Sequence, residues 1–247
     1  MDLISVVIPY YKKKDTISVT VNSVLKQTYK NFEIIIVYDD VSEKDFNYIK
    51  EIKNKDSRIL IIQNKVNMGA GNSRNIGIEN SKGNFIAFLD ADDTWKNDKL
   101  IKQINFMKIN NYEVSHTSYS IINKNHKVIG NRIARNFLEL KDLLKSCDIG
   151  TSTVMIKKDL INNDIKFGSL KTKEDFVLWL KLLQKNTKIY GLNEILTFWS
   201  KSELSLSSST VQKLIDGFRV YHKYMNFNYI KSLYYLFCLS INFLLKK

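Results

Sequence analysis

The chain has 247 residues, of which 44% are hydrophobic and 26% are charged, a balance typical of globular proteins. This length is enough to bury one substantial core without disulfides or structural metals, so we expect one main domain followed by a tail. The two cysteines, Cys147 and Cys238, lie far apart and outside any Cys-x-x-Cys arrangement, which supports neither a disulfide framework nor a zinc site. Both are expected to be free thiols in a reducing compartment.

The charge and the first residues indicate a compartment and a class of partner. Residues 1–11 carry an acid at Asp2, a proline at Pro9 and only a short apolar run, so they do not match a secretion signal and predict a cytoplasmic protein. The formal charge of +13 favours anionic partners, which can be nucleotide phosphates, an anionic membrane surface or nucleic acid. A composition rich in Lys, Asn and Ile explains the same charge without any partner.

The first half of the chain predicts alternating strands and helices. Residues 15–27 place apolar side chains at three- and four-residue spacing, with Asp15 positioned to cap the start of a helix. Residues 73–79 predict a second helix. Such alternation indicates an α/β sheet whose strands run parallel in this half. The strands are expected in apolar, β-branched runs at residues 3–9, 32–37, 59–63 and 85–89.

The second half is less regular. A helix is expected after Trp95 to about Asn110, and residues 112–128 predict one or two strands with a polar turn at 123–125. Residues 173–184 predict another helix, and residues 200–210 form a serine-rich loop. We expect a main domain over residues 1–210, divided into halves of about 1–95 and 96–210, and a separate tail over 211–247.

The tail combines aromatic, basic and apolar residues. It ends in a mostly apolar run over residues 232–245, whereas a membrane-spanning helix needs roughly 20 residues. The run therefore predicts an amphipathic helix that either packs on the domain or lies in a membrane interface. In the second case Lys231, Lys246 and Lys247 would lie near anionic head groups.

Acidic residues follow two of the predicted strands. Asp39 and Asp40 follow the second strand, and Asp90, Asp92 and Asp93 follow the fourth. Because ligands bind beyond the carboxyl ends of strands in open α/β sheets, these carboxylates are expected to converge on one edge. The Asp-x-Asp of Asp90 and Asp92 can hold Mn²⁺ or Mg²⁺, which would neutralise charge on a departing diphosphate. The plainer alternative is that Asp93 or Asn97 caps the following helix.

Two further features are compatible with nucleotide binding. Asp40 can accept a hydrogen bond from a base or ribose, or form a local Asx turn. The segment 67–75 combines glycines that allow close backbone approach with Arg74, which can bind an anion through two N–H groups. This segment lacks the third glycine of the dinucleotide fingerprint and the Gly-Lys-Ser/Thr ending of a P-loop.

Asp175 is a candidate general base for an incoming hydroxyl. The alternative is a capping box, because Thr172 precedes it by three residues. Trp179 shares a helical face with Asp175 and either stacks on a sugar ring or belongs to the core. The three histidines lie outside any nucleophile-elbow motif, which argues against serine-hydrolase chemistry.

In this order, the motifs resemble glycosyltransferase family 2, whose members share the GT-A fold, a Rossmann-like mixed α/β sheet flanked by helices. The resemblance extends over roughly residues 3–210 and implies a nucleotide-binding half, an acceptor half and a C-terminal amphipathic helical tail. It is carried by residues 5–11, 23–28, 32–40, 69–77 and 83–95, and by Glu174-Asp175 with residues 178–180.

The resemblance implies roles for individual residues. Asp175 would be the catalytic base, and Asp92, with Asp90, would bind Mn²⁺ or Mg²⁺. A sugar or acceptor would contact Glu174, Trp179 and Trp95. The nucleotide of a UDP-sugar would contact Pro9, Tyr10, Tyr11, Asp40, Arg74, Asp90 and Ala91.

The implied reaction is a single displacement with inversion, in which the acceptor hydroxyl attacks the anomeric carbon as UDP leaves. The transferred group would be a hexosyl or N-acetylhexosaminyl residue. The tail resembles those of enzymes that build bacterial lipopolysaccharide, capsule or O-antigen, which implies a glycan or lipid-linked glycan acceptor and peripheral contact with the inner face of the cytoplasmic membrane. The Gln-x-x-Arg-Trp motif of processive synthases is absent, so one sugar is expected per acceptor.

The sequence also departs from the family pattern. Val41 replaces the usual glycine after Asp40, and Trp199, Ser200 and Ser202 occupy places where a Tyr-Arg pair and a histidine are common. These departures leave open a nucleotide-sugar binder without transfer activity. A basic nucleic-acid-binding module is the more distant alternative, and it lacks any recognised motif, so we expect no nucleic-acid partner.

Overall fold

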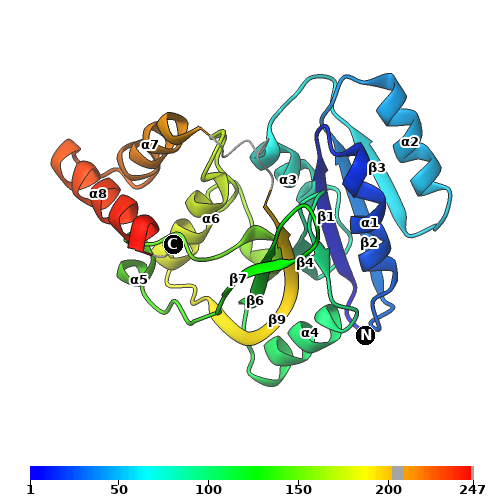
Figure 1. Cartoon of the computed structure of the whole chain (residues 1–247). Helices are drawn as coiled ribbons and strands as arrows, with labels where there is room; N and C mark the ends of the chain where they lie inside the picture. Colours follow the sequence, from blue (N-terminus) through cyan, green and yellow to red (C-terminus); the bar gives the residue numbers. More distant parts are fainter. Residues whose placement is uncertain (202–208, 246–247) are drawn as a thin grey trace.

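A computed structural model describes residues 1–201 and 209–245. Within them the strands form one mixed sheet with the order β3-β2-β1-β4-β8-β6-β9-β5, and β7 pairs with β6 outside this path. Helices cover both faces of the sheet, and the tail helices lie at the end farthest from β3 (Figure 1). The mixed α/β sheet agrees with the fold class predicted from the sequence.

The first four strands are parallel and lie close to their predicted positions. They are β1 (Ile4–Tyr10), β2 (Phe32–Tyr38), β3 (Ile59–Gln63) and β4 (Phe85–Phe88). The helices between them are α1 (Lys14–Leu25), α2 (Glu43–Lys53) and α3 (Ala70–Glu79). The predicted cap was wrong, because Lys13 is the N-cap of α1 and Asp15 lies inside its first turn.

The second half adds the antiparallel pairs and the parallel pair β6–β9. Its strands are β5 (Thr94–Trp95), β6 (Val114–Ile122), β7 (Val128–Arg132), β8 (Met155–Lys157) and β9 (Tyr190–Ser200). Its helices are α4 (Lys99–Ile109), α5 (Leu140–Leu144) and α6 (Glu174–Gln184), with short 3₁₀ turns η1 (Thr151–Thr153) and η2 (Lys158–Leu160). The elements α2, α5, β5, β8 and β9 were not predicted from the sequence.

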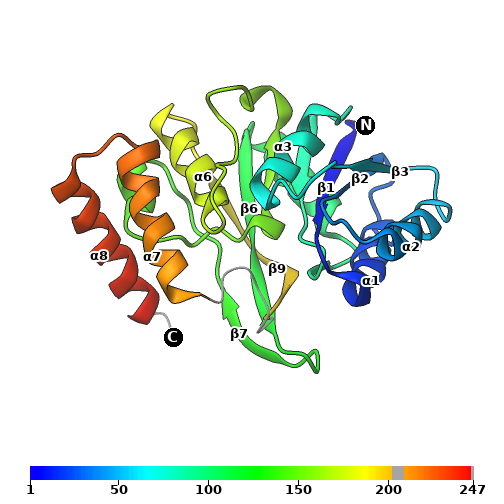
Figure 2. The ribbon, with the colours of Figure 1, turned by 90° about the horizontal axis from the view of Figure 1, so that it is seen from above.

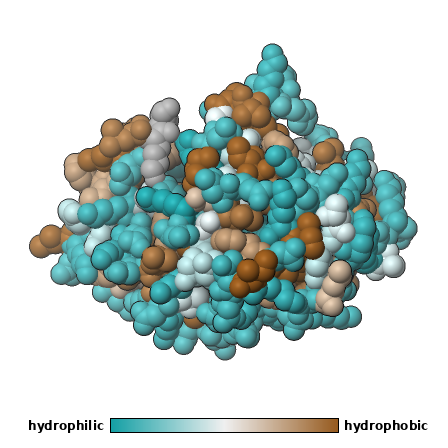
Figure 3. All heavy atoms as spheres, turned by 90° about the horizontal axis from the view of Figure 1, so that it is seen from below, coloured by the Kyte–Doolittle hydropathy of each residue, from teal (hydrophilic) through white to brown (hydrophobic). Residues whose placement is uncertain are grey.

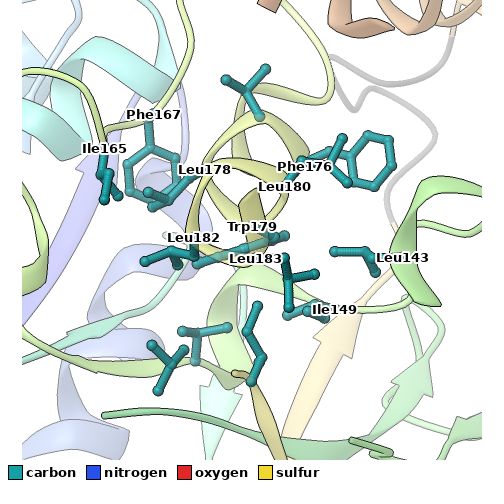
Figure 4. Packing of buried hydrophobic residues seen from close by; sticks show 14 of the residues in the cluster. Leu143, Ile149, Ile165, Phe167, Phe176, Leu178, Trp179, Leu180, Leu182 and Leu183 are labelled. Atoms are coloured by element: carbon teal, nitrogen blue, oxygen red, sulfur yellow. The ribbon is translucent and has the colours of Figure 1, made fainter. Parts of the chain in front are cut away.

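Two apolar clusters fill the two sides of the sheet. Alternate residues of β1 point to opposite faces, so Val7 joins one cluster whereas Val6 and Ile8 join the other. The first cluster surrounds α6 and contains the fully buried Trp179, packed among the side chains shown in Figure 4. The second cluster lies under α1, α2 and α4. These clusters hold the carboxyl ends of β1, β2 and β4 in fixed positions.

The tail consists of α7 (Thr210–Arg219), the π-helical turn η3 (Val220–Tyr224) and α8 (Tyr229–Leu245). Figure 2 shows α7 and α8 side by side next to α6. Four tail residues belong to the cluster around α6: Val220, Tyr221, Met225 and Leu239. Among the described helices, none combines the length and the hydropathy that crossing a bilayer requires.

Candidate active site

The predicted carboxylates lie at the carboxyl edge of the sheet, as the strand positions require. The backbone N–H of Asp39 donates to the carbonyl of Tyr10 (2.9 Å), and the N–H of Leu89 donates to that of Val7 (3.1 Å). The ends of β2 and β4 are therefore both joined to β1. The loops that follow them carry Asp39-Asp40 and Asp90-Ala91-Asp92-Asp93.

Asp39 orients the glycine-containing segment, a role that the sequence analysis did not assign. Its carboxylate accepts hydrogen bonds from the backbone N–H groups of Met68 (2.7 Å) and Gly69 (2.8 Å) and from the side-chain amide of Asn64 (2.8 Å). Gly69 has φ +80°, a conformation that favours glycine, at the N-cap of α3. Asp39 thereby fixes the point at which α3 begins.

Asp40 lies beside the predicted nucleoside residues. One carboxylate oxygen accepts from the backbone N–H of Lys12 (3.1 Å) and the other from that of Val41 (2.7 Å). The Tyr10 side chain is fully buried and stacks on Tyr38 at 5.1 Å between ring centroids. Pro9 and Tyr11 are partly exposed, and they remain candidates for such a contact.

Arg74 joins the Asp-x-Asp loop to α6. Its Nη2 lies 2.5 Å from Asp90 Oδ1 and its Nη1 lies 2.7 Å from Glu174 Oε1, with the guanidinium buried. Arg74 is therefore engaged by two carboxylates instead of extending into open space to meet a phosphate. A Cβ on Gly71 would lie 2.2 Å from the carbonyl oxygen of Gly168, so this glycine serves the close packing of α3 against the segment before α6.

The Asp-x-Asp loop separates into accessible and buried carboxylates. Asp92 pairs with Lys13 at 2.6 Å and remains partly exposed. Asp93 is buried, accepts from the Ser152 hydroxyl (2.5 Å) and the backbone N–H of Ser200 (2.8 Å), and does not cap α4. The carbonyl of Ala91 accepts from two α1 threonines, so it anchors the loop. Asp90 and Asp92 are thus the two available acids of this loop.

Burial disfavours the ionised form of three carboxyl groups in this region. Desolvation raises the pKa of Asp92, raises that of Asp93 well above its ordinary value, and raises that of Glu174 to about 7. Neighbouring carboxylates add to each shift. A further cation would offset this excess.

The donor set fits a hard divalent cation. No group of three or more His, Cys, Asp or Glu side chains with metal-binding geometry occurs in residues 1–201 and 209–245. However, Mg²⁺ is commonly bound by one or two protein carboxylates together with substrate phosphates and water. Asp90 and Asp92 match that arrangement in number and in chemistry, so the site has the acids that a metal–diphosphate complex needs.

Asp175 faces the same region from the first turn of α6. Its Oδ2 accepts from the Thr151 hydroxyl (2.8 Å), and its Oδ1 accepts from the backbone N–H of Phe176 (2.7 Å). The predicted capping box does not form, because Lys173 is the N-cap with φ +61° and Thr172 donates to Asp216 in α7. Asp175 is therefore oriented by a side chain from another element.

The turn η1 connects the two acidic groups. Thr151 bonds the carboxylate of Asp175, while the next residue, Ser152, donates to Asp93 and accepts from the backbone N–H of Asp90 (3.0 Å). The sequence analysis missed both residues, since a Thr-Ser-Thr run carries no recognisable spacing. Two adjacent hydroxyls thus fix the position of Asp175 relative to the Asp-x-Asp loop.

The two tryptophans predicted to contact a sugar are buried. Trp179 has no exposed surface and packs edge-on against Phe167, with 6.0 Å between ring centroids (Figure 4). Trp95 is 3% exposed, and its indole N–H donates to the carbonyl of Ser152 (2.7 Å). Both rings belong to the core of this structure, the alternative that the sequence left open for Trp179. Glu174, the third predicted contact, is engaged by Arg74.

Lys99 packs against Trp95, and the burial of its charge is expected to lower the stability of the fold. Its Nζ is fully buried 3.8 Å from the Trp95 ring centroid, without a hydrogen-bond partner among the described residues, and desolvation lowers its pKa well below the ordinary value. Between this lowered pKa and 10.5 the unfolded chain binds more protons at this lysine, so its presence makes wild-type stability rise with pH within that window. Lys99→Met is expected to raise the free energy of unfolding by about 1–3 kcal/mol at pH 7.

Urea unfolding of wild type and Lys99→Met between pH 6 and 9 would measure this effect. The advantage of the variant should shrink as pH rises, because deprotonation removes the cost of burying the charge. Lys102→Met, at an exposed lysine three residues along the same helix, is the matched control. A loss of stability in Lys99→Met would mean that the contact with Trp95 outweighs desolvation.

The serine-rich end of β9 contacts the Asp-x-Asp loop. The Ser200 hydroxyl donates to the carbonyl of Asp92 (2.6 Å), so this position supports the loop through its backbone. Ser202 lies outside the described residues, as do residues 203–208 of the predicted serine-rich loop. Val41 is 80% exposed and is not among the residues with positive φ, so a valine is accommodated where the family usually has glycine.

Comparison with known proteins identifies this arrangement. The family model described as "Glycosyl transferase family 2" matches residues 5–163. This chain belongs to glycosyltransferase family 2. The match includes the Asp-x-Asp loop and η1, whereas Asp175 lies beyond its end. The protein is therefore a glycosyltransferase, as its sequence motifs indicated.

Related glycosyltransferases match nearly the whole chain. The UDP-Glc:alpha-D-GlcNAc-diphosphoundecaprenol beta-1,3-glucosyltransferase WfgD of Escherichia coli is 36% identical over 236 residues, which cover 95% of this chain and 90% of WfgD. The putative teichuronic acid biosynthesis glycosyltransferase TuaG of Bacillus subtilis is 34% identical, over 93% of this chain and 91% of TuaG. Similarity thus extends through α6 and into the tail.

The solved structures agree on the fold. The structure of S. aureus TarS residues 1–349 in complex with UDP-GlcNAc superposes with a TM-score of 0.76 at 22% identity, covering 91% of this chain and 65% of that one. The chain therefore spans less than two thirds of that TarS fragment. The likeness confirms the GT-A fold, a curled mixed sheet with helices on both faces.

Proposed function

We propose that this glycosyltransferase moves one sugar, with inversion, from a UDP-sugar to a hydroxyl of a lipid-linked glycan in bacterial surface polysaccharide or lipopolysaccharide synthesis. The observation that carries the proposal is the link through η1 between the Asp-x-Asp loop and Asp175. This link joins acids suited to a metal-bound diphosphate to a carboxylate suited to deprotonating an acceptor.

The donor is proposed to bind at the carboxyl edge of β1 and β2. Asp40 would accept a hydrogen bond from the nucleoside, and the partly exposed Pro9 and Tyr11 would contact the base. WfgD is named for UDP-Glc, and TarS was solved with UDP-GlcNAc, which supports a UDP-sugar without selecting the sugar. Arg74 contributes indirectly, because it holds Asp90 in place.

Family 2 enzymes generally use a divalent metal, and we propose that Asp92, with Asp90, holds Mn²⁺ or Mg²⁺ here. When bound, such an ion neutralises negative charge on the departing diphosphate. Lys13 approaches Asp92 from the start of α1 and adds positive charge at the same place. Because Asp93 is buried and bonded to Ser152, it supports the loop and stays outside the ligand set.

Asp175 is proposed to take the proton from the acceptor hydroxyl. The Thr151 hydroxyl and the Phe176 N–H both donate to its carboxylate and so hold it in one orientation. The carboxylate is partly exposed, so an acceptor can reach it. Inversion follows from attack by this activated oxygen on the face opposite the departing UDP.

The acceptor is proposed to be lipid-linked, because the name of WfgD specifies a diphosphoundecaprenol acceptor and the two chains align over most of their length. Such an acceptor lies in a bilayer, so we place the enzyme peripherally on the inner face of the cytoplasmic membrane. The main domain would then occupy residues 1–210 and the tail residues 211–247, in line with the start of α7 at Thr210.

UDP release from a panel of UDP-sugars, with Mn²⁺ and a lipid-linked GlcNAc diphosphate acceptor, would test the proposal. We expect release with at least one donor, and loss of release after addition of EDTA. Calorimetry with UDP should show binding in the same buffer. Binding of UDP without turnover of any donor would favour the inactive nucleotide-sugar binder, whereas failure to bind UDP would contradict the assignment of the donor site.

A further inference from the structure

The last helix has two apolar faces, and the fold buries only one of them. Ser232 and Leu239 are buried, and Tyr235 and Leu236 pack on the cluster around α6. The opposite stripe faces outward, with Ile230 82% exposed and Phe237 64% exposed. The residues of this outward stripe follow helical spacing: Ile230, Leu233, Tyr234, Phe237, Ile241, Leu244 and Leu245. Tyr229 and Phe243 of α8 are also exposed, outside the stripe.

The neighbouring helix α7 has an exposed apolar stripe of its own. Val211, Leu214 and Ile215 of α7 are exposed at one-turn spacing. Figure 3 shows a brown cluster at the upper left, on the side where Figure 1 places α8, and further brown patches near the centre of the view. We call the outward residues of α7 and α8 the tail face. A soluble chain seldom leaves so many large apolar side chains together on one face without a partner.

The charges around the tail face have one sign. Between Ser209 and Leu245 the sequence has a single acid, Asp216, and that residue is fully buried. The exposed charged residues of the same segment are Arg219, Lys223 and Lys231. Lys145 of the adjoining loop lies 5.8 Å from the ring centroid of Tyr234. An apolar face with a basic rim matches the interface of an anionic bilayer in both chemistry and layout.

The buried acid fixes the tail to the segment that carries the candidate base. Asp216 accepts from the backbone N–H (3.0 Å) and the hydroxyl (3.1 Å) of Thr172, three residues before Asp175. The Tyr221 hydroxyl also donates to the carbonyl of Leu144 (2.6 Å), and the Asn242 amide to that of Lys145 (2.8 Å). The tail face therefore has a fixed orientation relative to α6.

We infer that the tail face is a membrane-docking surface that binds an anionic lipid bilayer. This inference rests on the proposed function, because a lipid-linked acceptor lies in a bilayer. Its physical basis is the exposure of the apolar side chains and the positive charge of the residues around them. Bound in this way, α8 lies in the interface with its outward stripe among the acyl chains and with Lys231, Lys223 and Arg219 near the phosphates. Asp216 then sets the position of Asp175 relative to the bilayer in which the acceptor is held.

A second copy of this chain is the less suitable occupant. Pairing two tail faces would bring the same basic rims together, and each chain carries a net charge of +13. Like charges facing one another across an interface oppose association. An anionic bilayer instead gains from the same charges, with roughly 1 kcal/mol contributed by each Lys or Arg near the surface.

Co-sedimentation of the full chain with vesicles of phosphatidylglycerol and phosphatidylcholine would test the inference. Wild type should bind anionic vesicles and lose binding as salt is raised or phosphatidylglycerol is omitted. Ile230→Asn with Phe237→Asn should lower the partition coefficient at least about tenfold, because the apolar contribution is lost. Val19→Asn with Ile109→Asn, two exposed apolar residues on α1 and α4, should leave binding unchanged.

Other measurements separate this surface from the catalytic proposal. UDP binding by the tail variant should equal that of wild type, since neither residue lies at the carboxyl edge of the sheet. Equal vesicle binding by wild type and the tail variant would overturn the inference even if the enzyme is active. A wild-type dimer that the tail variant converts to a monomer, with no vesicle binding, would assign the face to a second copy.

Discussion

Asp175→Asn is expected to lower kcat for sugar transfer by about 10³-fold and to leave UDP affinity unchanged, since positioned general bases contribute between about 10²- and 10⁴-fold. Asparagine has nearly the same shape as aspartate. Its carbonyl oxygen can still accept from the Phe176 N–H, and its amide can donate to the Thr151 hydroxyl, so the first turn of α6 should keep its conformation. Stopped assays with donor and acceptor, alongside calorimetry with UDP, would measure both quantities.

Substitutions at Thr151 are expected to have a smaller effect on the same step. Thr151→Val removes the donor to Asp175 Oδ2 while keeping the shape, so Asp175 should be held less firmly and kcat should fall about tenfold, by less than in Asp175→Asn. Thr151→Ser keeps a hydroxyl and should retain the wild-type kcat. Unchanged kcat in Asp175→Asn would remove Asp175 from the role of base, and an effect of Thr151→Val would then have another cause.

The sequence was sufficient to predict the first four strands. β1, β2 and β4 are almost wholly buried, so each is a short continuous apolar run, and acids directly after β2 and β4 must meet at one edge. The edge strand β3 is only partly buried, but its sequence is also a short apolar run. The missed elements lack such a signal. In α2 only Ile49 and Ile52 are buried among charged residues, and β9 contains Asn193 and Glu194 within its length.

Errors at the site arose where distant residues decide the role of a local motif. Thr172 matches a capping box, yet its hydroxyl donates to Asp216, forty-four residues along the chain. Trp179 shares a helical face with Asp175, but one turn advances about 5.4 Å along the axis. That step takes the side chain from the site into the core between β4 and α6. Helical spacing predicts which residues share a face of the helix, but it does not predict how deeply each side chain is buried.

Asp92→Asn is expected to lower metal-activated sugar transfer by about 100-fold or more, because several kcal/mol of charge stabilisation depend on the ion and each 1.4 kcal/mol is tenfold in rate. The substitution removes one negative charge next to Lys13 and keeps the shape of the side chain. The apparent affinity for Mn²⁺ in the presence of UDP should fall in parallel. Titration of UDP release with Mn²⁺ would give both numbers.

Asp98→Asn is the matched control, since it makes the same chemical change at an exposed acid paired with Lys102. It should leave both the rate and the Mn²⁺ titration as in wild type. If Asp92→Asn behaves like this control while EDTA still inactivates wild type, Asp92 is outside the ligand set. If EDTA leaves wild type active, Lys13 becomes the group that meets the diphosphate, because its partner Asp92 already holds it beside the carboxyl end of β4. Lys13→Met would then lower the rate of sugar transfer more than Asp92→Asn does. The order of these two effects therefore shows whether the metal ion or Lys13 stabilises the departing UDP.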